Sequence, residues 1–157
     1  MSSLVRVTGT WTSLITDWLD YEQLPAPDLR AALGRWAPED AVPMAVWRDM
    51  LARAVTLLPS SAATALAIGA RVQPRHIGVL GYLVLASTTL GEAMQAYQRY
   101  ERLFYGADLA EVSVEGNQAE MRWQTDRESF GLLHDSVAIA SLVTFLRRQI
   151  DQTPPPT

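Results

Sequence analysis

The sequence contains no cysteine and no lysine. The absence of cysteine excludes disulfide bonds, thiolate catalysis and cysteine-ligated metals. All thirteen basic residues are arginines, they are scattered along the chain, and the net charge is −4. A domain that binds duplex nucleic acid usually carries a basic stripe that displaces counterions from phosphates, and this sequence has none. We therefore expect no nucleic-acid binding by this chain alone.

Long hydrophobic runs are missing too. No segment reaches the roughly eighteen uncharged apolar residues that a membrane helix needs, and the N-terminus lacks the basic flank and apolar core of a signal peptide. The sequence therefore predicts a soluble, cytoplasmic protein without a membrane partner. An apolar share of 48% over 157 residues excludes wholesale disorder and fits one domain with a hydrophobic core.

Signatures of catalysis and of metal binding are absent as well. The two histidines, His76 and His134, stand far apart and lack the His-x-x-x-His spacing of metal ligands. Neither a Gly-x-Ser-x-Gly element nor a phosphate-binding glycine loop occurs. A helix can satisfy the hydroxyls of Ser141 and Thr144 through its own carbonyls. We expect no enzyme, no metal and no cofactor.

Helical periodicity dominates the first half of the sequence. Four helices are expected there from apolar residues at helical spacing. They cover residues 11–21, 28–33, 43–58 and 62–68. Asp28 is expected to cap the second helix, and Ser60 or Ser61 the fourth. Thr89 and Glu92 have the spacing of a reciprocal capping box, which predicts a further helix from Leu90 to near Gly106.

The period changes to two near residue 110. Apolar residues alternate with polar ones over 111–115 and 118–123, and Gly116-Asn117 between them fits a type II′ turn. That turn fixes a register in which Val112 pairs with Met121. The fold class is therefore α+β, mostly helical, with an antiparallel β-hairpin at about 110–124.

The hairpin alternation also predicts burial. Met121 and Trp123 are expected inside, with Glu120 and Arg122 outside. Because a lone two-stranded hairpin is marginal in water, we expect further strands to complete the sheet. They would come from residues 4–8 or from a partner chain that replaces strands lying beyond the present C-terminus.

The last predicted helix, over 132–150, is apolar on nearly every side, so it is expected to be buried in the domain or in a subunit contact. His134, which Asp135 follows at the start of this helix, is expected to have a structural capping role. Consecutive prolines then favour polyproline II, which predicts a folded domain over 1–152 and a disordered tail over 153–157.

One stretch carries a recognisable motif. It reads Gly78-x-x-Gly81-Tyr82, then Ser87-x-Thr89-Leu90-Gly91-Glu92-Ala93, then Tyr100. This motif resembles the arabinose-binding-type N-terminal effector domain of AraC-type bacterial transcription regulators, in the branch of ornithine-utilisation and virulence regulators. A weaker likeness extends over most of the chain.

The resemblance implies a function. Such a domain senses a small organic metabolite, dimerises, and alters how an attached helix-turn-helix domain engages a promoter. Amino acids, aromatic acids and fatty acids are all possible effectors by this resemblance. Nothing after Arg148 could supply a helix-turn-helix, so DNA binding is expected only through a domain not present in this chain. Two alternatives stay open: a protein-interaction or dimerisation module without a ligand, and an uncharacterised small-molecule enzyme.

Candidate ligand-binding residues come from the same region and from the hairpin. Arg75 and His76 lie beside the apolar run and could bind a ligand carboxylate through charge-assisted hydrogen bonds, or they could simply form a solvated helix start. Aromatic side chains could line an apolar pocket or pack in the core. These are Tyr82, Tyr97, Tyr100, Phe104 and Trp123.

Overall fold

The computed structural model describes residues 5–106, 108, 110–123 and 131–151. Over these residues the chain forms eight helices and two small antiparallel sheets, which confirms the expected α+β, mostly helical class. The elements are β1 (Arg6–Thr8), α1 (Gly9–Tyr21), α2 (Pro27–Leu33), β2 (Ala41–Pro43), α3 (Met44–Val55), α4 (Ser61–Gly69), α5 (Pro74–Ile77), α6 (Val79–Leu85), α7 (Leu90–Tyr105), β3 (Ala110–Glu115), β4 (Gln118–Trp123) and α8 (Leu132–Asp151).

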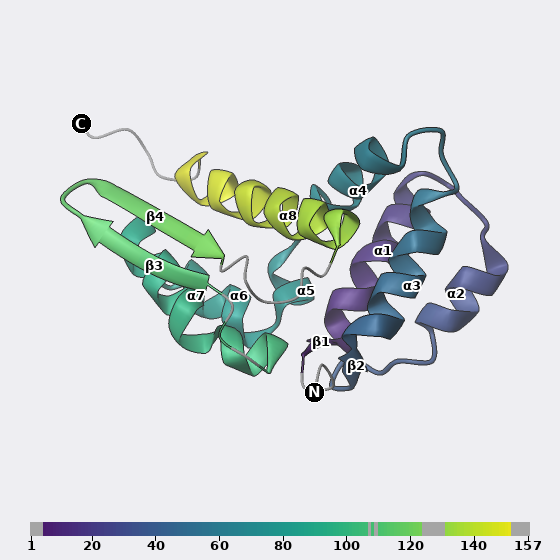
Figure 1. Cartoon of the computed structure of the whole chain (residues 1–157), viewed down its shortest axis with the longest axis horizontal. Helices are drawn as coiled ribbons and strands as arrows, with labels where there is room; N and C mark the ends of the chain where they lie inside the picture. The colour runs from purple at the N-terminus through teal and green to yellow at the C-terminus, as the bar shows by residue number, and fades with distance from the viewer. Residues whose placement is uncertain (1–4, 107, 109, 124–130, 152–157) are drawn as a thin grey trace.

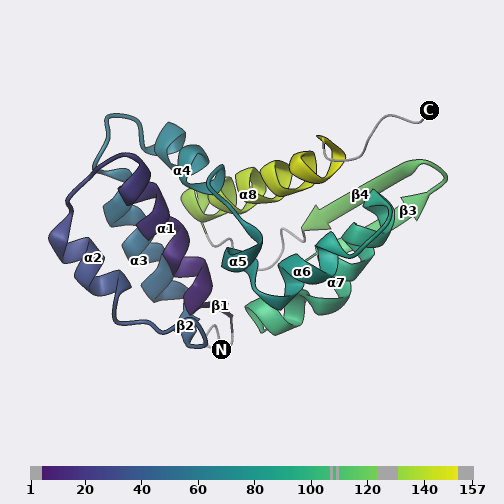
Figure 2. The same ribbon diagram turned by 180° about the vertical axis from the view of Figure 1, so that it is seen from behind.

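The elements form two groups that α8 joins. Helices α1, α2 and α3 pack together at one end of the molecule, and at the other the β3–β4 hairpin lies along α7, which also packs on α6 (Figure 1). Helix α8 runs lengthwise from α4 toward the hairpin, and the view from behind shows the same arrangement (Figure 2). Among the described residues, no helix has the length and apolarity needed to cross a bilayer.

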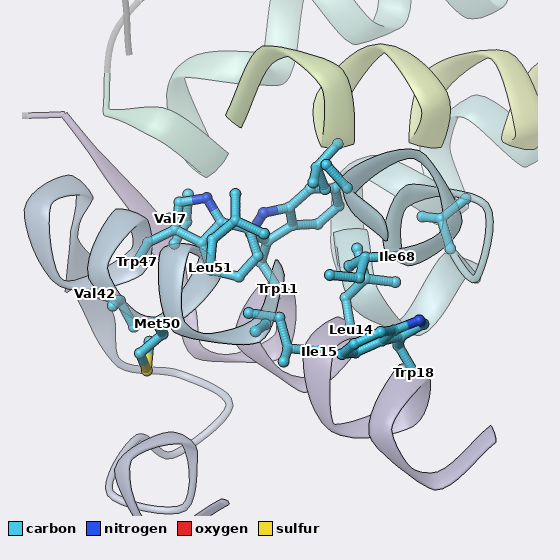
Figure 3. Packing of buried hydrophobic residues seen from close by; sticks show 14 of the residues in the cluster. Val7, Trp11, Leu14, Ile15, Trp18, Val42, Trp47, Met50, Leu51 and Ile68 are labelled. Carbon is cyan, nitrogen blue, oxygen red and sulfur yellow. The ribbon is translucent and has the colours of Figure 1, made fainter. Parts of the chain in front are cut away.

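The densest core lies between α1 and α3. The indole rings of Trp11 and Trp47 lie 6.0 Å apart between centroids, a separation typical of tilted aromatic pairs (Figure 3). Leu14, Trp18 and Ile68 continue this core toward α4, and all three are fully buried. The apolar spacing that predicted α1 therefore marks the residues that fix it to its neighbours.

The hairpin register is confirmed. Val112 pairs with Met121, and the flanking pairs follow the predicted order. Gly116 has a φ of 59°, the left-handed value that a type II′ turn requires at its first central residue. Gly91 on α7 allows the hairpin to approach closely, because a Cβ there would lie 3.3 Å from the Cγ1 of Val114.

The expected completion of the hairpin sheet by residues 4–8 is wrong. Strand β1 pairs with β2 instead, with Val7 opposite Val42, and it forms a separate two-stranded sheet. Both valines are fully buried against the N-terminal helices. The hairpin packs against α7, which covers one of its faces, and among the described residues β3 and β4 form a sheet of two strands.

Two of the three helix caps predicted from the sequence are present in the structure. The Ser60 hydroxyl accepts from the backbone N–H of Ala63, and the Thr89 hydroxyl accepts from that of Glu92 at 3.1 Å. In the capping box predicted at Thr89, the Glu92 carboxylate was expected to accept from the backbone N–H of Thr89. In the structure it accepts from the backbone N–H and the hydroxyl of Thr88.

The predicted cap of α2 is wrong. Helix α2 begins at Pro27, so Asp28 lies within the first turn, and the N-cap residue is Ala26 with a φ of 33°. Pro27 supplies the fixed φ of a first helical position, so the helix starts two residues earlier than a cap at Asp28 predicts.

Of the two expected alternatives for α8, burial in the domain or in a subunit contact, burial within the chain holds for one side of the helix only. Val137, Ser141 and Phe145 are buried, and α8 packs closely on α4 at Gly69, where a Cβ would lie 2.6 Å from the Val137 carbonyl oxygen. The opposite side carries an exposed apolar stripe, which we call the α8 stripe. It consists of Leu132, Ile139 and Val143. The expected tail over 153–157 lies outside the described residues.

Candidate functional site

A narrow cleft lies where α7, α8 and β4 meet α1, α5 and α6. The space inside it that a water molecule can reach is about 40 Å³, and it opens to solvent. The described lining residues are Trp11, Ile77, Leu80, Gly81, Val84, Ala93, Met94, Tyr97, Tyr105, Met121, Ala138, Ser141, Leu142, Phe145 and Leu146. A concave, mostly apolar site with a few polar groups is the usual form of a small-molecule pocket.

The shape of the cleft depends on small residues. Gly81 brings α6 onto α5, because a Cβ there would lie 2.8 Å from the Pro74 carbonyl oxygen. Ala93 on α7 and Ala138 on α8 line it with short side chains. Met94 and Met121 complete the walls with flexible, polarisable side chains that can adapt to a ligand.

The polar groups of the cleft come mainly from α7. Tyr97 and Tyr105 both line it, and their phenols hydrogen-bond to each other. Burial raises the pKa of Tyr97 well above its usual value and raises the pKa of Tyr105 to about 12. Both phenols therefore stay neutral at physiological pH. The Ser141 hydroxyl on α8 donates to the Gly69 carbonyl at 3.2 Å, so it also fastens α8 to α4.

Glu101 lies between the two tyrosines along α7 and is fully buried. Residues 97, 101 and 105 are spaced four apart, so they share one face of the helix. One carboxylate oxygen of Glu101 accepts the backbone N–H of Ala110 at 2.8 Å, which fixes the start of β3 against α7. The negative charge of Glu101 contributes to raising the pKa of both phenols.

Arg75 and His76 lie outside the described lining of the cleft. Nε2 of His76 donates to the Asp17 carboxylate at 2.7 Å, while Nδ1 accepts the backbone N–H of Gln73 at 2.9 Å. The Arg75 guanidinium also donates to Asp17. Burial lowers the pKa of His76, although the Asp17 carboxylate opposes that effect. The pair therefore ties α5 to α1 and leaves no imidazole nitrogen for a ligand.

The five aromatic candidates do not come together at one site. Tyr97 lines the cleft, while Tyr100 packs partly buried against the hydrophobic core. Tyr82 is exposed on the outer side of α6. Trp123 is 41% exposed, so the expectation that it lies inside is wrong, whereas Met121 is partly buried in the cleft wall and Glu120 and Arg122 are exposed as expected. The side chain of Phe104 lies outside the described residues.

His134 has a structural role, as expected, although its partner is different. Nδ1 of His134 accepts the indole N–H of Trp47 at 2.9 Å, which connects α8 to α3. Burial, with a smaller contribution from Arg48, lowers the pKa of His134 to about 4. The described residues contain no group of three or more side chains placed to hold a metal ion.

Sequence reasoning missed most of the cleft. Trp11, Met94 and the α8 wall were assigned to the core, because the helical spacing of a core residue and of a cleft residue is the same. The sequence offered one indication for Tyr105, because it lies one helical turn beyond Glu101 on the same face of the helix as Tyr97. A buried carboxylate there marks a face that is not simply core.

A second, open groove lies over α1 and α2. Its arginines are already engaged: Arg30 donates to the Asp20 carboxylate at 2.7 Å and Arg75 to that of Asp17. The groove is therefore a weaker candidate than the cleft, because its cations are committed to partners within the chain.

Comparison with known proteins agrees with this geometry. No curated protein and no solved structure matches the chain. A family model described as the arabinose-binding domain of AraC transcription regulators, N-terminal, matches residues 30–157. The match contains every described lining residue of the cleft except Trp11. The family consists of effector-sensing regulatory domains, which are not enzymes. The chain belongs to the family of N-terminal arabinose-binding domains of AraC transcription regulators.

Proposed function

We propose that this chain senses a small organic metabolite in the cleft between α7 and α8. The observation that carries the proposal is a cleft with apolar walls from six elements, lined by the partly buried Tyr97 and the buried Tyr105. The motif beginning at Gly78 supports placing the chain in the branch of ornithine-utilisation and virulence regulators.

A thermal-shift screen with bacterial metabolites tests this function. A ligand at a hundredfold excess over its Kd should add ~2.7 kcal/mol of stability. The cleft-filling variant Ala138→Phe should abolish each response, whereas Ala31→Phe on the exposed side of α2 should not. Hits that survive Ala138→Phe would place the site elsewhere. A screen without hits would favour the alternative of an interaction module without a ligand.

We also propose that the chain forms a homodimer through the α8 stripe. Leu132 is 77% exposed, and Ile139 and Val143 continue the same side of α8 at spacings of seven and four residues. Monomers rarely leave such a patch uncovered. Helix α8 also forms one wall of the cleft, so the proposed interface and the proposed ligand site share this element.

Sedimentation of the wild type and two variants tests the interface. Ile139→Glu should convert a dimer to a monomer because it places a charge in the centre of the stripe. Leu66→Glu, at an exposed apolar position on α4, is the matched control and should remain dimeric. A wild-type chain that stays monomeric up to high micromolar concentration would contradict this proposal.

For DNA, we propose that residues 1–157 bind no promoter in a sequence-specific manner. The net charge of −4 and the dispersed arginines support this, since backbone neutralisation dominates affinity for DNA. Regulation would then need a helix-turn-helix domain, fused or separate. Sub-micromolar, sequence-dependent binding in an anisotropy titration at physiological salt would overturn the statement.

A further inference from the structure

The cleft is too narrow for an organic effector as it stands. Its interior offers about 40 Å³ that water can reach. One water molecule needs about 10–15 Å³, and a cavity that binds benzene measures about 150 Å³. One wall must therefore move away from the others when a metabolite enters.

The α8 wall is fastened to the N-terminal half of the chain. The Ser141 hydroxyl donates to the Gly69 carbonyl at 3.2 Å, and the Arg148 guanidinium donates to the Val72 carbonyl. Both acceptors lie at the C-terminal end of α4 or just beyond it. At the other end of α8, His134 accepts the indole N–H from α3 at 2.9 Å. Helix α8 is therefore held to α3 and α4 along its length.

The opposite wall forms a packed group of its own. Helix α7 packs on α6 and on both strands of the hairpin. Near the end of α7, a Glu101 carboxylate oxygen accepts the backbone N–H of Ala110 at 2.8 Å. Near its start, a Cβ on Gly91 would lie 3.3 Å from the Cγ1 of Val114. Because the hairpin is joined to both ends of α7, we call α6, α7, β3 and β4 together the α7 unit.

Gly78 connects this unit to α5. Its φ of 67° and ψ of −140° belong to a region that residues with a side chain rarely adopt. Just before it, Nε2 of His76 donates to the Asp17 carboxylate at 2.7 Å, so α5 is fixed to α1. In both views α5 lies between α1 and α6 (Figures 1 and 2). A single residue between a fixed helix and a separate packed group is a typical hinge position. The second connection of the unit, over 124–130, lies outside the described residues.

We propose that the cleft opens when the α7 unit rotates about Gly78 and moves away from α8, which stays on α4. This inference rests on the proposed function of the cleft and names how the site admits its ligand. Helix α7 also packs on β1, so the unit would pivot on that strand rather than leave the N-terminal helices. A metabolite that fills the widened cleft would then shift the population toward the open arrangement.

Spin-label distances test this rotation without a ligand. The chain has no native cysteine, so labels attach only at introduced positions. The pair Leu66→Cys and Gln95→Cys measures across the cleft. Gln95→Cys with Glu120→Cys measures within the α7 unit, and Leu66→Cys with Arg147→Cys measures between α4 and α8. All four side chains are exposed. Dilution with unlabelled chain restricts the signal to distances within one molecule.

Two wedge variants should force the opening. Ala138→Phe and the milder Ala138→Leu enlarge a side chain of the α8 wall. We expect Ala138→Phe to lengthen the distance across the cleft by about 3–4 Å, the contact distance of one added layer of carbon atoms. Ala138→Leu should lengthen it less, and both internal distances should stay unchanged. Ala31→Phe on the exposed side of α2 is the control and should change none of the three.

Three results would overturn the rotation. These are unchanged distances in the folded wedge variants, equal changes in an internal pair, and failure of both variants to fold, because a hinged wall accommodates a leucine. The proposed function fails separately. If the distances stay fixed while Ala138→Phe abolishes a metabolite response, only the rotation is wrong. If the wedges open the cleft but no metabolite binds, the rotation holds and only the sensing function fails.

The hinge position has its own test. A Cβ on Gly78 or on Gly116 would have no atom within 4 Å, so alanine at either site tests the backbone alone. Gly78→Ala should lengthen the distance across the cleft, because it disfavours the closed backbone conformation. Gly116→Ala, at another positive φ, should not. Wild-type distances in a folded Gly78→Ala chain would overturn Gly78 as the hinge.

Discussion

Acidification should destabilise this domain through His134 at a pH where most carboxylates have not yet titrated. The side chain is 4% exposed, and its Nδ1 accepts the indole N–H of Trp47 at 2.9 Å. Protonation would place a proton on that nitrogen, facing another donor. Burial and Arg48 accordingly lower the pKa of His134 to about 4.

The sign and the size of the effect follow from linkage. Between pH 6.5 and 4 the unfolded chain binds a proton on this histidine that the folded chain does not, so the stability is complete above pH 6.5 and falls with decreasing pH. A pKa difference of 6.5 − 4 corresponds to about 3 kcal/mol in total, of which about 2 kcal/mol is lost by pH 5. His76, whose pKa is also lowered, adds a loss in the same direction.

Urea unfolding at pH 8 and pH 5 measures this loss, with His134→Asn as the matched variant. The asparagine Oδ1 can replace Nδ1 as the acceptor for Trp47 but does not titrate. We expect the wild type to lose about 2 kcal/mol more than His134→Asn over this range. Parallel pH profiles for the two proteins would refute the reasoning, because the loss would then come from other groups.

Further substitutions give distinct expectations in the same urea assay. Gly69→Ala should cost about 1–3 kcal/mol because its Cβ would lie 2.6 Å from the Val137 carbonyl oxygen, and an unchanged midpoint would show that α4 and α8 can separate. Gly116→Val should cost about 1–2 kcal/mol at a φ of 59°; a neutral result would argue against the turn. Trp123→Ala should cost no more than about 1 kcal/mol, since the indole is 41% exposed, and a larger loss would indicate a covered tryptophan.

Local signals predicted local structure well in this chain. The hairpin register required only the alternation of side chains and a glycine-first turn, and both act within a dozen residues. The caps at Ser60 and Thr89 are equally local. By contrast, alternation shows which residues share a face but not what covers that face. For this reason Met121, next to the cleft, is partly buried while Trp123, two residues later on the same face, is exposed.

For a similar reason, the sequence did not predict which distant segments of the chain contact each other. The cleft joins Trp11 of α1 to Leu146 of α8, and no pattern in either segment indicates that they meet. The uniform apolarity of α8 indicated burial on every side. The structure divides that surface between α4, the cleft and the exposed α8 stripe, a division that depends on where the neighbouring helices end.

His76 shows why buried polar groups are hard to interpret from sequence. A histidine beside an apolar run fits a ligand site, but a fully buried imidazole needs partners on both nitrogens, because an unsatisfied buried group costs about 1–3 kcal/mol. Asp17 and the Gln73 backbone N–H supply them. Trp47 likewise supplies the Nδ1 partner of His134 from a distant helix. Polar residues of this kind join elements, whereas the phenols of Tyr97 and Tyr105 line the cleft.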